Sequence, residues 1–416
     1  MSDWAKDQLG ALVDFQKGRK VETSPFLLPG YERYLGAGSL AGGHDGYAST
    51  FLAVQANEND VLMLWDGERS GLVGHNLSGV VSSTVSKLTP NGKIISNLLY
   101  YYLLFNFEWI QNRRTGTGVP HVPKDLARIL KLRYPVGEKY QKKLAAILDT
   151  IDQAIEKTEA LIHKYQQIKA GLIHDLFTRG LTADGKLRPP REQAPELYQE
   201  TPIGWIPKEW GIGVVSDYGA VKLGRQRSPD QHSGRWTTPY LRVANVFDGF
   251  IDFSDVLEMD FTPIEKETFS VKYGDILLNE GQSLELVGRS AVYQGEDDKF
   301  CFQNTLVRFR CYKNHHPLFY GFLFKWWLDI GLFRQISKQT TSVAHLGADR
   351  FARMHCPVVH YDEQLFITER LSAIQERIDF ENNQLSKYRQ IKAGLMHDLL
   401  TGKVPVTIDN SETSHV

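Results

Sequence analysis

The sequence predicts an α+β protein made of two tandem domains, each an irregular sheet packed with a few helices. Two long helices are expected to separate the domains and to pair as an antiparallel coiled coil, with pseudo-twofold symmetry. Three observations predict this architecture: a strong internal repeat, an apolar heptad pattern inside the repeated segments, and short β-like runs between them.

The internal repeat is clearest near the ends of the two expected helices. YQQIKAGLIHDLFT starts at Tyr165 and YRQIKAGLMHDLLT starts at Tyr388, with eleven of fourteen positions identical at an offset of 223. A weaker match extends upstream, where Gly18 matches Gly224 and NDVLMLWDGERSGLVG resembles GDILLNEGQSLELVG. The chain is therefore two copies of one unit, with a drifted domain and a nearly constant segment. If the two nearly constant segments bind the same kind of partner and the two diverged domains bind different ligands, this difference is explained. The alternative is that the surfaces of any duplicated protein diverge faster than the rest.

Both repeated segments have the spacing of a coiled-coil helix. Neither contains proline, and the position skipped in the apolar pattern is polar in both copies, Thr158 and Glu381. Two copies of one seam are expected to pack against each other, although each helix could instead cover only its own domain. The apolar positions, with the same steps in both copies, are Leu144, Leu148, Ile151, Ile155, Ile162 and Tyr165, and Ile367, Leu371, Ile374, Ile378, Leu385 and Tyr388.

The regions between the expected helices contain short runs of β-forming residues bounded by Gly, Asn, Asp and Pro. Apolar helical stretches follow them, and the polar, proline-rich linker LRPPREQAPE is expected to be an exposed connector. The β-like runs are Val61–Trp65, Val80–Leu88, Val214–Val221, Asp275–Leu278 and Thr305–Arg310, and the helical stretches are Asn97–Ile110 and Pro317–Ile336. The expected boundaries are 1–137 for the first domain, 138–180 for the first helix, 181–201 for the linker, 202–358 for the second domain, 359–404 for the second helix and 405–416 for the tail.

Composition excludes several classes of protein. The net charge of -1 provides no global positive field, so any site for a polyanion must be a local patch. Three cysteines form no disulfide framework, which predicts a cytoplasmic, reduced protein. The N-terminal MSDWAKDQLG is unlike a signal peptide, and the longest apolar runs are far shorter than the ~20 residues of a membrane span.

Motifs for catalysis are not found in the sequence. There is no GxxxxGK[ST] phosphate loop, no NPPY or DPPY tetrapeptide and no GxSxG, and LGAGSLAGG lacks the strand–turn–helix setting of a cofactor loop. Cys301 and Cys311 have no second pair, so no metal site is expected. His174–Asp175 and His397–Asp398 recur, but neighbours on a helix point about 100° apart, which favours packing or a partner contact over catalysis.

Local basicity is the remaining signal. The window 113–133 contains six positive residues and one acid, Asp125. Similar polar and basic loops occur at equivalent places in the second copy, where Lys and Arg can neutralise phosphates and Asn, Gln, Thr and Arg can read base edges. An ordinary solvated surface is the alternative. The positive residues of the window are Arg113, Arg114, Lys124, Arg128, Lys131 and Arg133.

Together these features resemble the specificity subunit of a type I restriction-modification system. The helix ends IKAGLMHDLLTGKVPV and IKAGLIHDLFTRGL are similar to that family's KxGLMxDLLTGKV, and IGWIPKEW and GDILLNEG resemble its domain entry and central strand. DEQ at 362–364 matches the family's helix start. The first domain departs most: its entry is reduced to DWAKDQLG, GDILL becomes NDVLML, and its helix starts at GEKYQ, without the EQ pair.

The resemblance implies a non-catalytic subunit with two target-recognition domains, each reading one half of a bipartite, asymmetric site in double-stranded DNA. Its helices would dock two modification (methyltransferase) subunits, and two restriction subunits with the motor and nuclease would complete the assembly. S-adenosylmethionine, ATP and Mg would then lie on the partners, and this chain would hold no cofactor. The rival hypotheses are a stand-alone nuclease or methyltransferase with an unrecognised site, and a protein-only coiled-coil scaffold.

Candidate contacts follow from these hypotheses. The candidate DNA contacts are Lys17, Arg19, Lys20, Arg69, His75, Arg113, Arg114, Thr115, His121, Arg225, Arg227, Arg242, Asn279, Arg289, Lys338, Thr340, Thr341 and His345. The candidate partner contacts are Lys169, His174, Asp175, Lys392, His397 and Asp398.

Overall fold

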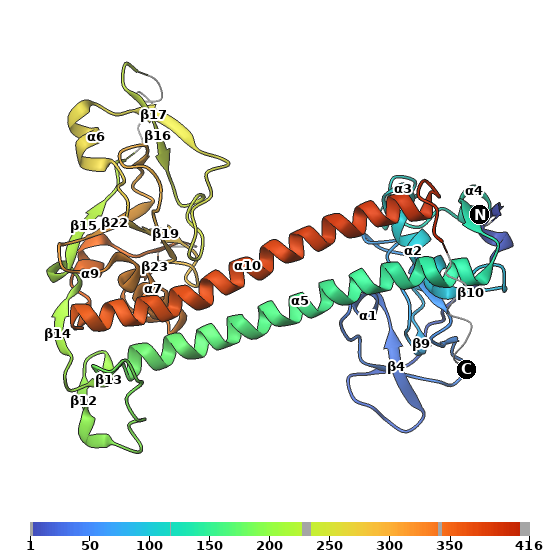
Figure 1. Ribbon diagram of the computed structural model, residues 1–416, viewed down its shortest axis with the longest axis horizontal. Helices are drawn as coiled ribbons and strands as arrows, with labels where there is room; N and C mark the ends of the chain where they lie inside the picture. Colours follow the sequence, from blue (N-terminus) through green and yellow to red (C-terminus); the bar gives the residue numbers. More distant parts are fainter. Residues whose placement is uncertain (1–2, 117, 227–233, 340–342, 408–416) are drawn as a thin grey trace. The chain divides into compact units, whose positions relative to one another are not determined.

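The computed structural model describes residues 3–116, 118–226, 234–339 and 343–407, which form two compact units (Figure 1). Unit 1 comprises Met1–Leu161 and Glu381–Val416, and unit 2 comprises Ile162–Phe380. Each unit combines one sheet-rich domain with part of each long helix, α5 (Glu138–Thr178) and α10 (Tyr361–Leu400). The expected α+β class is confirmed. Among the described residues, no helix is long and apolar enough to cross a membrane.

The two long helices pair in antiparallel fashion within each unit. In unit 1, Asp152 of α5 forms an ion pair with Lys392 of α10 at 2.6 Å, whereas Glu159, further along α5, bonds Arg389, further back on α10. In unit 2, the Lys169 ammonium donates a hydrogen bond to Gln375. The expected coiled-coil pairing is therefore confirmed.

The apolar seam explains why these segments form paired helices. Leu144, Leu148, Ile367 and Leu371 are at most 2% exposed, so each helix buries its heptad face. Thr158, at the skipped polar position of the first copy, is also buried, and its hydroxyl donates a hydrogen bond to the Ala154 carbonyl at 2.8 Å. A bond to the helix's own backbone lets a polar residue occupy a buried position there.

The domain of unit 1 packs its core against both helices. Residues of α2, including Leu98 and Tyr102, share a hydrophobic core with Leu148 of α5 and with Met396 and Leu399 of α10. The main sheets run β2-β10-β7-β8 and β3-β5-β4-β9-β6, and β1 pairs with β11. The elements are β1 (Trp4–Gln8), β2 (Val13–Lys17), β3 (Thr23–Ser24), β4 (Tyr31–Leu35), α1 (Ala37–Leu40), β5 (Tyr47–Ser49), β6 (Gln55–Ala56), β7 (Val61–Leu64), β8 (Val73–Gly74), β9 (Gly79–Val81), β10 (Val85–Pro90), α2 (Ser96–Phe105), α3 (Phe107–Gln111), α4 (Leu126–Ile129) and β11 (Lys131–Pro135).

The domain of unit 2 is organised in the same way. Its α7 lies beside the long helices, while β16, β17 and α6 lie at the far end of the domain (Figure 1). The sheets run β15-β22-β18-β20, β17-β16-β21 and β19-β24-β23, with the pairs β12-β13 and β14-β25. The elements are β12 (Tyr198–Thr201), β13 (Gly204–Pro207), β14 (Gly211–Val214), β15 (Gly219–Leu223), β16 (Thr237–Leu241), β17 (Leu257–Asp260), α6 (Pro263–Phe269), β18 (Ile276–Asn279), β19 (Gly281–Gln282), β20 (Ser290–Val292), β21 (Cys301–Phe302), β22 (Leu306–Cys311), α7 (Pro317–Asp329), α8 (Leu332–Ile336), β23 (Lys338–Gln339), β24 (Ala344–His345), α9 (Ala348–Ala352) and β25 (His355–Val358).

The two four-stranded sheets are equivalent. In each, a glycine directly follows the first strand, and its N–H donates to the last strand of the sheet in chain order: Gly18 to Val85 of β10, and Gly224 to Leu306 of β22. A Cβ at either glycine would lie about 2 Å from a backbone carbonyl oxygen, 2.1 Å at Gly18 and 2.2 Å at Gly224. A residue with a side chain does not fit at this close contact between backbone segments, which explains why both copies have glycine here.

Several expected elements are broken in the structure. The run Val80–Leu88 forms two strands, β9 and β10, because Ser82 and Thr84 make a turn between them. The run Val214–Val221 is interrupted by a 3-10 turn. The helical stretches divide into α2 and α3, and into α7 and α8, the latter pair at Gly331 with a positive φ of 77°.

The linker after α5 was expected to be an exposed connector, and much of it is exposed, but some of its residues are buried. Arg188 is only 4% exposed, and its guanidinium donates to Glu363 at the start of α10 at 2.8 Å and to Glu209. Glu363 also accepts hydrogen bonds from the Leu181 N–H and from the Trp210 indole. These bonds fix the linker against unit 2, because a buried charge must be paired.

Candidate nucleic-acid interface

The neighbouring arginines Arg113 and Arg114, in the basic window of unit 1, differ in exposure and in their contacts. Arg113 is exposed, and its guanidinium lies 4.0 Å from the centre of the Trp109 ring. It also donates a hydrogen bond to the Trp109 carbonyl at 3.2 Å. Arg114 is less exposed and donates to the backbone carbonyls of Glu68 and Gln111. Arg113 is therefore the more accessible of the two to a phosphate, whereas Arg114 holds the loop in place.

A short chain of polar contacts links the first strand to this loop. Lys17, at the end of β2, pairs with Asp66 at 2.7 Å, and Asp66 also contacts His121 Nδ1 at 2.7 Å. Partial burial alone would raise the pKa of Asp66, but hydrogen bonds from Lys17 and His121 outweigh it and lower the pKa. Asp66 is therefore ionised at neutral pH and acts as a hydrogen-bond acceptor.

Unit 2 places an acid and a histidine in a similar way. His345, in β24, contacts Glu280 through Nδ1 at 2.9 Å. Lys338 is exposed in β23 and lies opposite His345 in the strand pairing. This edge of the unit 2 domain thus gathers two candidate residues that are seven positions apart in the sequence.

Other candidates in unit 2 have internal partners. Arg225 is 7% exposed, forms an ion pair with Glu265 at 2.8 Å and lies over the Phe261 ring. Asn279 is fully buried in β18. Neither side chain is presented at the surface, because a partner from a distant part of the chain covers it. The sequence offered no sign of this burial.

The remaining DNA candidates vary in exposure. Arg242 pairs with Asp255 at 2.6 Å, and Arg289 lies over the Phe247 ring. His75 is half-buried and stacks on Tyr100 at 3.8 Å between ring centres; burial lowers its pKa. The exposed members are Arg19, Lys20, Arg69 and Thr115. Arg227, Thr340 and Thr341 lie outside the described residues. Direct contact with DNA stays a prediction for every candidate.

The partner candidates also divide into two groups. Lys392 and Lys169 are partly buried: each reaches across to the other helix and lies over a ring of its own unit's domain, Tyr101 at 5.9 Å and Phe322 at 5.7 Å. His174 and His397, by contrast, are exposed. Asp175 pairs with Arg179 and Asp398 with Lys403. The histidines are therefore the most accessible members of this candidate set.

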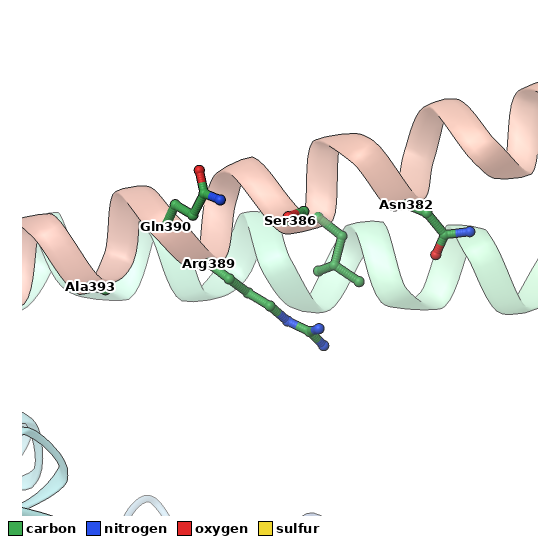
Figure 2. Close-up of a pocket in the computed structure, with 6 residues that line it drawn as sticks. Asn382, Ser386, Arg389, Gln390 and Ala393 are labelled. Carbon is green, nitrogen blue, oxygen red and sulfur yellow. The ribbon is translucent and has the colours of Figure 1, made fainter. Parts of the chain in front are cut away.

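A shallow depression of about 400 Å³ lies along α10 in unit 1 (Figure 2). Figure 2 shows Arg389 extending from α10, where its guanidinium pairs with Glu159 of α5. The lining is mostly uncharged and polar, which suits contact with another macromolecule better than it suits a small charged ligand. The lining residues are Asn382, Leu385, Ser386, Arg389, Gln390 and Ala393.

The glycine-rich loop of unit 1 already has an internal anion. The backbone N–H groups of Gly36, Gly38 and Ser39 all donate to the Asp45 carboxylate, at 2.6–3.1 Å. The N–H groups that could have held a phosphate are thereby occupied, which fits an ordinary turn. In the described parts of the chain, no group of three or more His, Cys, Asp or Glu side chains is placed to hold a metal ion.

Sequence reasoning missed the acids that hold the two histidines, Asp66 and Glu280. Neither acid is near its histidine in the sequence: 55 residues separate Asp66 from His121, and 65 separate Glu280 from His345. The nearest signal was the weak repeat match around β7 and β18, which contains both acids.

The fold defines a class of protein: two sheet-rich domains of shared topology, carried by an antiparallel pair of repeated helices. Residues 1–166 match the family model described as the type I restriction modification DNA specificity domain. The resemblance found in the sequence is confirmed: the chain is similar to type I restriction-modification specificity subunits.

Individual relatives cover nearly the whole chain. It is 26% identical to the type I restriction enzyme MjaVIII specificity subunit of Methanocaldococcus jannaschii, over 97% of this chain and 93% of that protein. A putative MjaX specificity subunit from the same organism is 24% identical over 50% of this chain and 49% of its own length. Among solved structures, the S subunit of a type I system from M. genitalium matches with a TM-score of 0.60 at 14% identity, covering 98% of this chain and 97% of that chain.

Proposed function

We propose that the chain is the DNA sequence-recognition subunit of a type I restriction-modification complex. The observation that carries this proposal is the shared order of the two four-stranded sheets, β2-β10-β7-β8 and β15-β22-β18-β20, on domains whose surface residues differ. A common frame with two different surfaces suits a protein that reads two different half-sites. The relatives named above support the same function.

Each domain would read one half of a bipartite, asymmetric site in double-stranded DNA. In unit 1, the exposed Arg113, Arg19 and Lys20 supply positive charge for phosphates. In unit 2, the exposed Lys338 occupies the strand next to His345. Positive charge is thus concentrated locally, as a chain with a net charge of -1 requires.

The repeated helix segments would dock two modification subunits, one for each copy. Ile168 and Ile391 are equivalent in the repeat, and both are exposed, at 45% and 49%. Each lies on the same helix segment as an exposed histidine, His174 or His397. One kind of partner bound twice would explain why this segment is nearly constant between the copies.

The chain itself would be non-catalytic and would act in the cytoplasm. S-adenosylmethionine would bind the modification subunits, and ATP and Mg would bind two restriction subunits that complete the complex. The occupied glycine-rich loop at Asp45 supports the view that this chain holds no cofactor of its own.

The experiment is a domain exchange in the reconstituted complex. The chain alone should methylate nothing, whereas the chain mixed with its modification subunit should methylate adenine at one bipartite sequence. Replacing residues 210–357 by the second domain of another specificity subunit should change one half-site and leave the other half unchanged.

Mapping the methylated adenines distinguishes the outcomes. Methylation by the lone chain would support the rival enzyme hypothesis. A change in both half-sites after the exchange would show that the domains do not read DNA independently.

A further inference from the structure

The two acid–histidine contacts sit at the same point of the two domains. The residue after His121 donates its N–H to the Trp65 carbonyl, and the residue after His345 donates to the Glu280 carbonyl. Trp65 and Glu280 are themselves equivalent, because their N–H groups bond Thr84 and Thr305 at the same place in the sheet. His121 and His345 are therefore matched positions of the repeated fold.

The acids, in contrast, come from different backbone positions. In unit 2 the acid is Glu280, at the matched position itself, whereas in unit 1 it is Asp66, one residue later. The later residue has the shorter side chain, and both carboxylates reach the same histidine atom, Nδ1. Both domains therefore have an acid–histidine contact, although the acid stands at different positions of the repeat. Other nearby residues differ: Lys17 of unit 1 corresponds to Leu223 in unit 2. Packing alone does not require a carboxylate beside the histidine Nδ1 in both domains.

The contact fixes how each imidazole can bind. An ionised carboxylate only accepts, so Nδ1 carries a hydrogen and Nε2 is left for another group. The acids are mostly covered, with side chains 20% and 15% exposed, whereas the histidine side chains are 45% and 44% exposed. Within the described ranges, neither Nε2 has a hydrogen-bond partner. Each domain therefore presents one oriented, open nitrogen.

Basic residues lie near both histidines, as expected for a site that binds DNA phosphates. Each histidine lies in a backbone pairing near a basic residue: His121 pairs with Thr115, next to Arg114, and His345 pairs with Lys338. The charged groups that face His121 are Asp66 and, through it, Lys17. Those around His345 are Glu280, Lys338 and Arg350, whose guanidinium donates to the His345 carbonyl.

We infer that His121 and His345 are matched DNA contacts, one for each half-site, in which the carboxylate orients the imidazolium so that Nε2–H donates to an acceptor atom of DNA. This inference rests on the proposed function. The acceptor is a phosphate oxygen or the O6 or N7 edge of guanine, which share the chemistry of an exposed, electron-rich atom. Asp66 and Glu280 act as positioning residues.

The test measures binding of the reconstituted complex to a duplex that carries the methylated site. His121→Ala should weaken binding by roughly 5- to 150-fold, the range of a good base contact at about 1–3 kcal/mol. His121→Gln, whose side-chain amide can donate a hydrogen bond from a similar place, should retain more affinity than His121→Ala. His345→Gln should likewise retain more affinity than His345→Ala.

The positioning role is tested by Asp66→Ala and Glu280→Ala, which should weaken binding although neither acid touches DNA. His360→Gln is the matched control, because His360 also lies near an acid, 3.7 Å from Asp362, but at the start of α10. It should leave the affinity unchanged. A base contact is indicated if His121→Ala relaxes specificity at one position of the site. A phosphate contact is indicated if it weakens all sequences alike and reduces the salt slope by about 0.9.

Two results would overturn the inference. One is unchanged affinity for His121→Ala and His345→Ala. The other is an equal loss of affinity in the alanine and glutamine variants, as expected if the histidines only pack against the local backbone. Failure of the proposed function is a separate result, since the wild-type complex would then show no site-specific binding at all.

Discussion

Replacing Glu363 by alanine should destabilise unit 2 far more than replacing Glu209, although both acids bond the same arginine. Arg188 has a side chain that is 5% exposed, and the side chain of Glu363 is 12% exposed. Glu209, in contrast, is 75% exposed. The two substitutions therefore remove a buried and an exposed partner of one cation.

The magnitude follows from what each variant leaves behind. Without Glu363, Arg188 keeps only an exposed partner, and breaking a buried pair in this way costs about 3–5 kcal/mol. The Trp210 indole N–H also loses its acceptor, which lies at 2.9 Å. Without Glu209, Arg188 keeps Glu363, so the loss should be at most about 1 kcal/mol, the value of an exposed ion pair.

The assay is urea unfolding of the purified chain, with hydrogen exchange of residues 181–210 as a local measure. Glu369→Gln, an exposed change on the same helix, is the control and should be neutral. Similar, small losses for Glu363→Ala and Glu209→Ala would refute the reasoning, because they would show that Arg188 is hydrated in solution.

Three further predictions concern charge, helix length and thiols. Arg113→Ala should weaken DNA binding by the complex and reduce the log–log salt slope by about 0.9, and an unchanged slope would assign Arg113 to an ordinary solvated surface. Deleting residues 153–156 and 376–379 removes about 6 Å from each helix, so the spacer between half-sites should shorten by about two base pairs; an active complex with an unchanged spacer would contradict a ruler role. Burial raises the pKa of Cys301 and of Cys311 to about 12, and it raises the pKa of Cys356 as well. A thiol reagent at about pH 8 should therefore label the three cysteines only after unfolding. Rapid labelling of the native chain would contradict this prediction.

The parts of the fold that sequence could predict depend on local periodicity. The seam positions Leu144, Leu148 and Leu371 repeat along a single helix, so their burial could be inferred without knowing the fold. The match of Gly18 to Gly224 was also visible, because the same close strand crossing excludes every side chain in both copies.

The parts that could not be predicted depend on residues far apart in the chain. The linker looked exposed because its residues are polar, but Arg188 meets Glu363 across 175 positions. Arg225 looked like a phosphate contact until α6 supplied Glu265. The histidine contacts were hidden for another reason. The acid stands one residue later in the first copy than in the second, so an alignment of the two copies does not place Asp66 and Glu280 at the same position. In the structure, both carboxylates contact the Nδ1 atom of the matched histidine.

The division of the chain between the units has a consequence for the order in which the protein can fold during synthesis. Unit 2 is continuous, Ile162–Phe380, and all of it exists once Phe380 has been made. Unit 1 begins earlier but needs Met396, Leu399 and Leu400 to complete its core. On the ribosome, the second domain can therefore finish folding first, while the first domain waits with an apolar face uncovered. A chaperone that binds nascent chains would be expected to cover that face until α10 emerges.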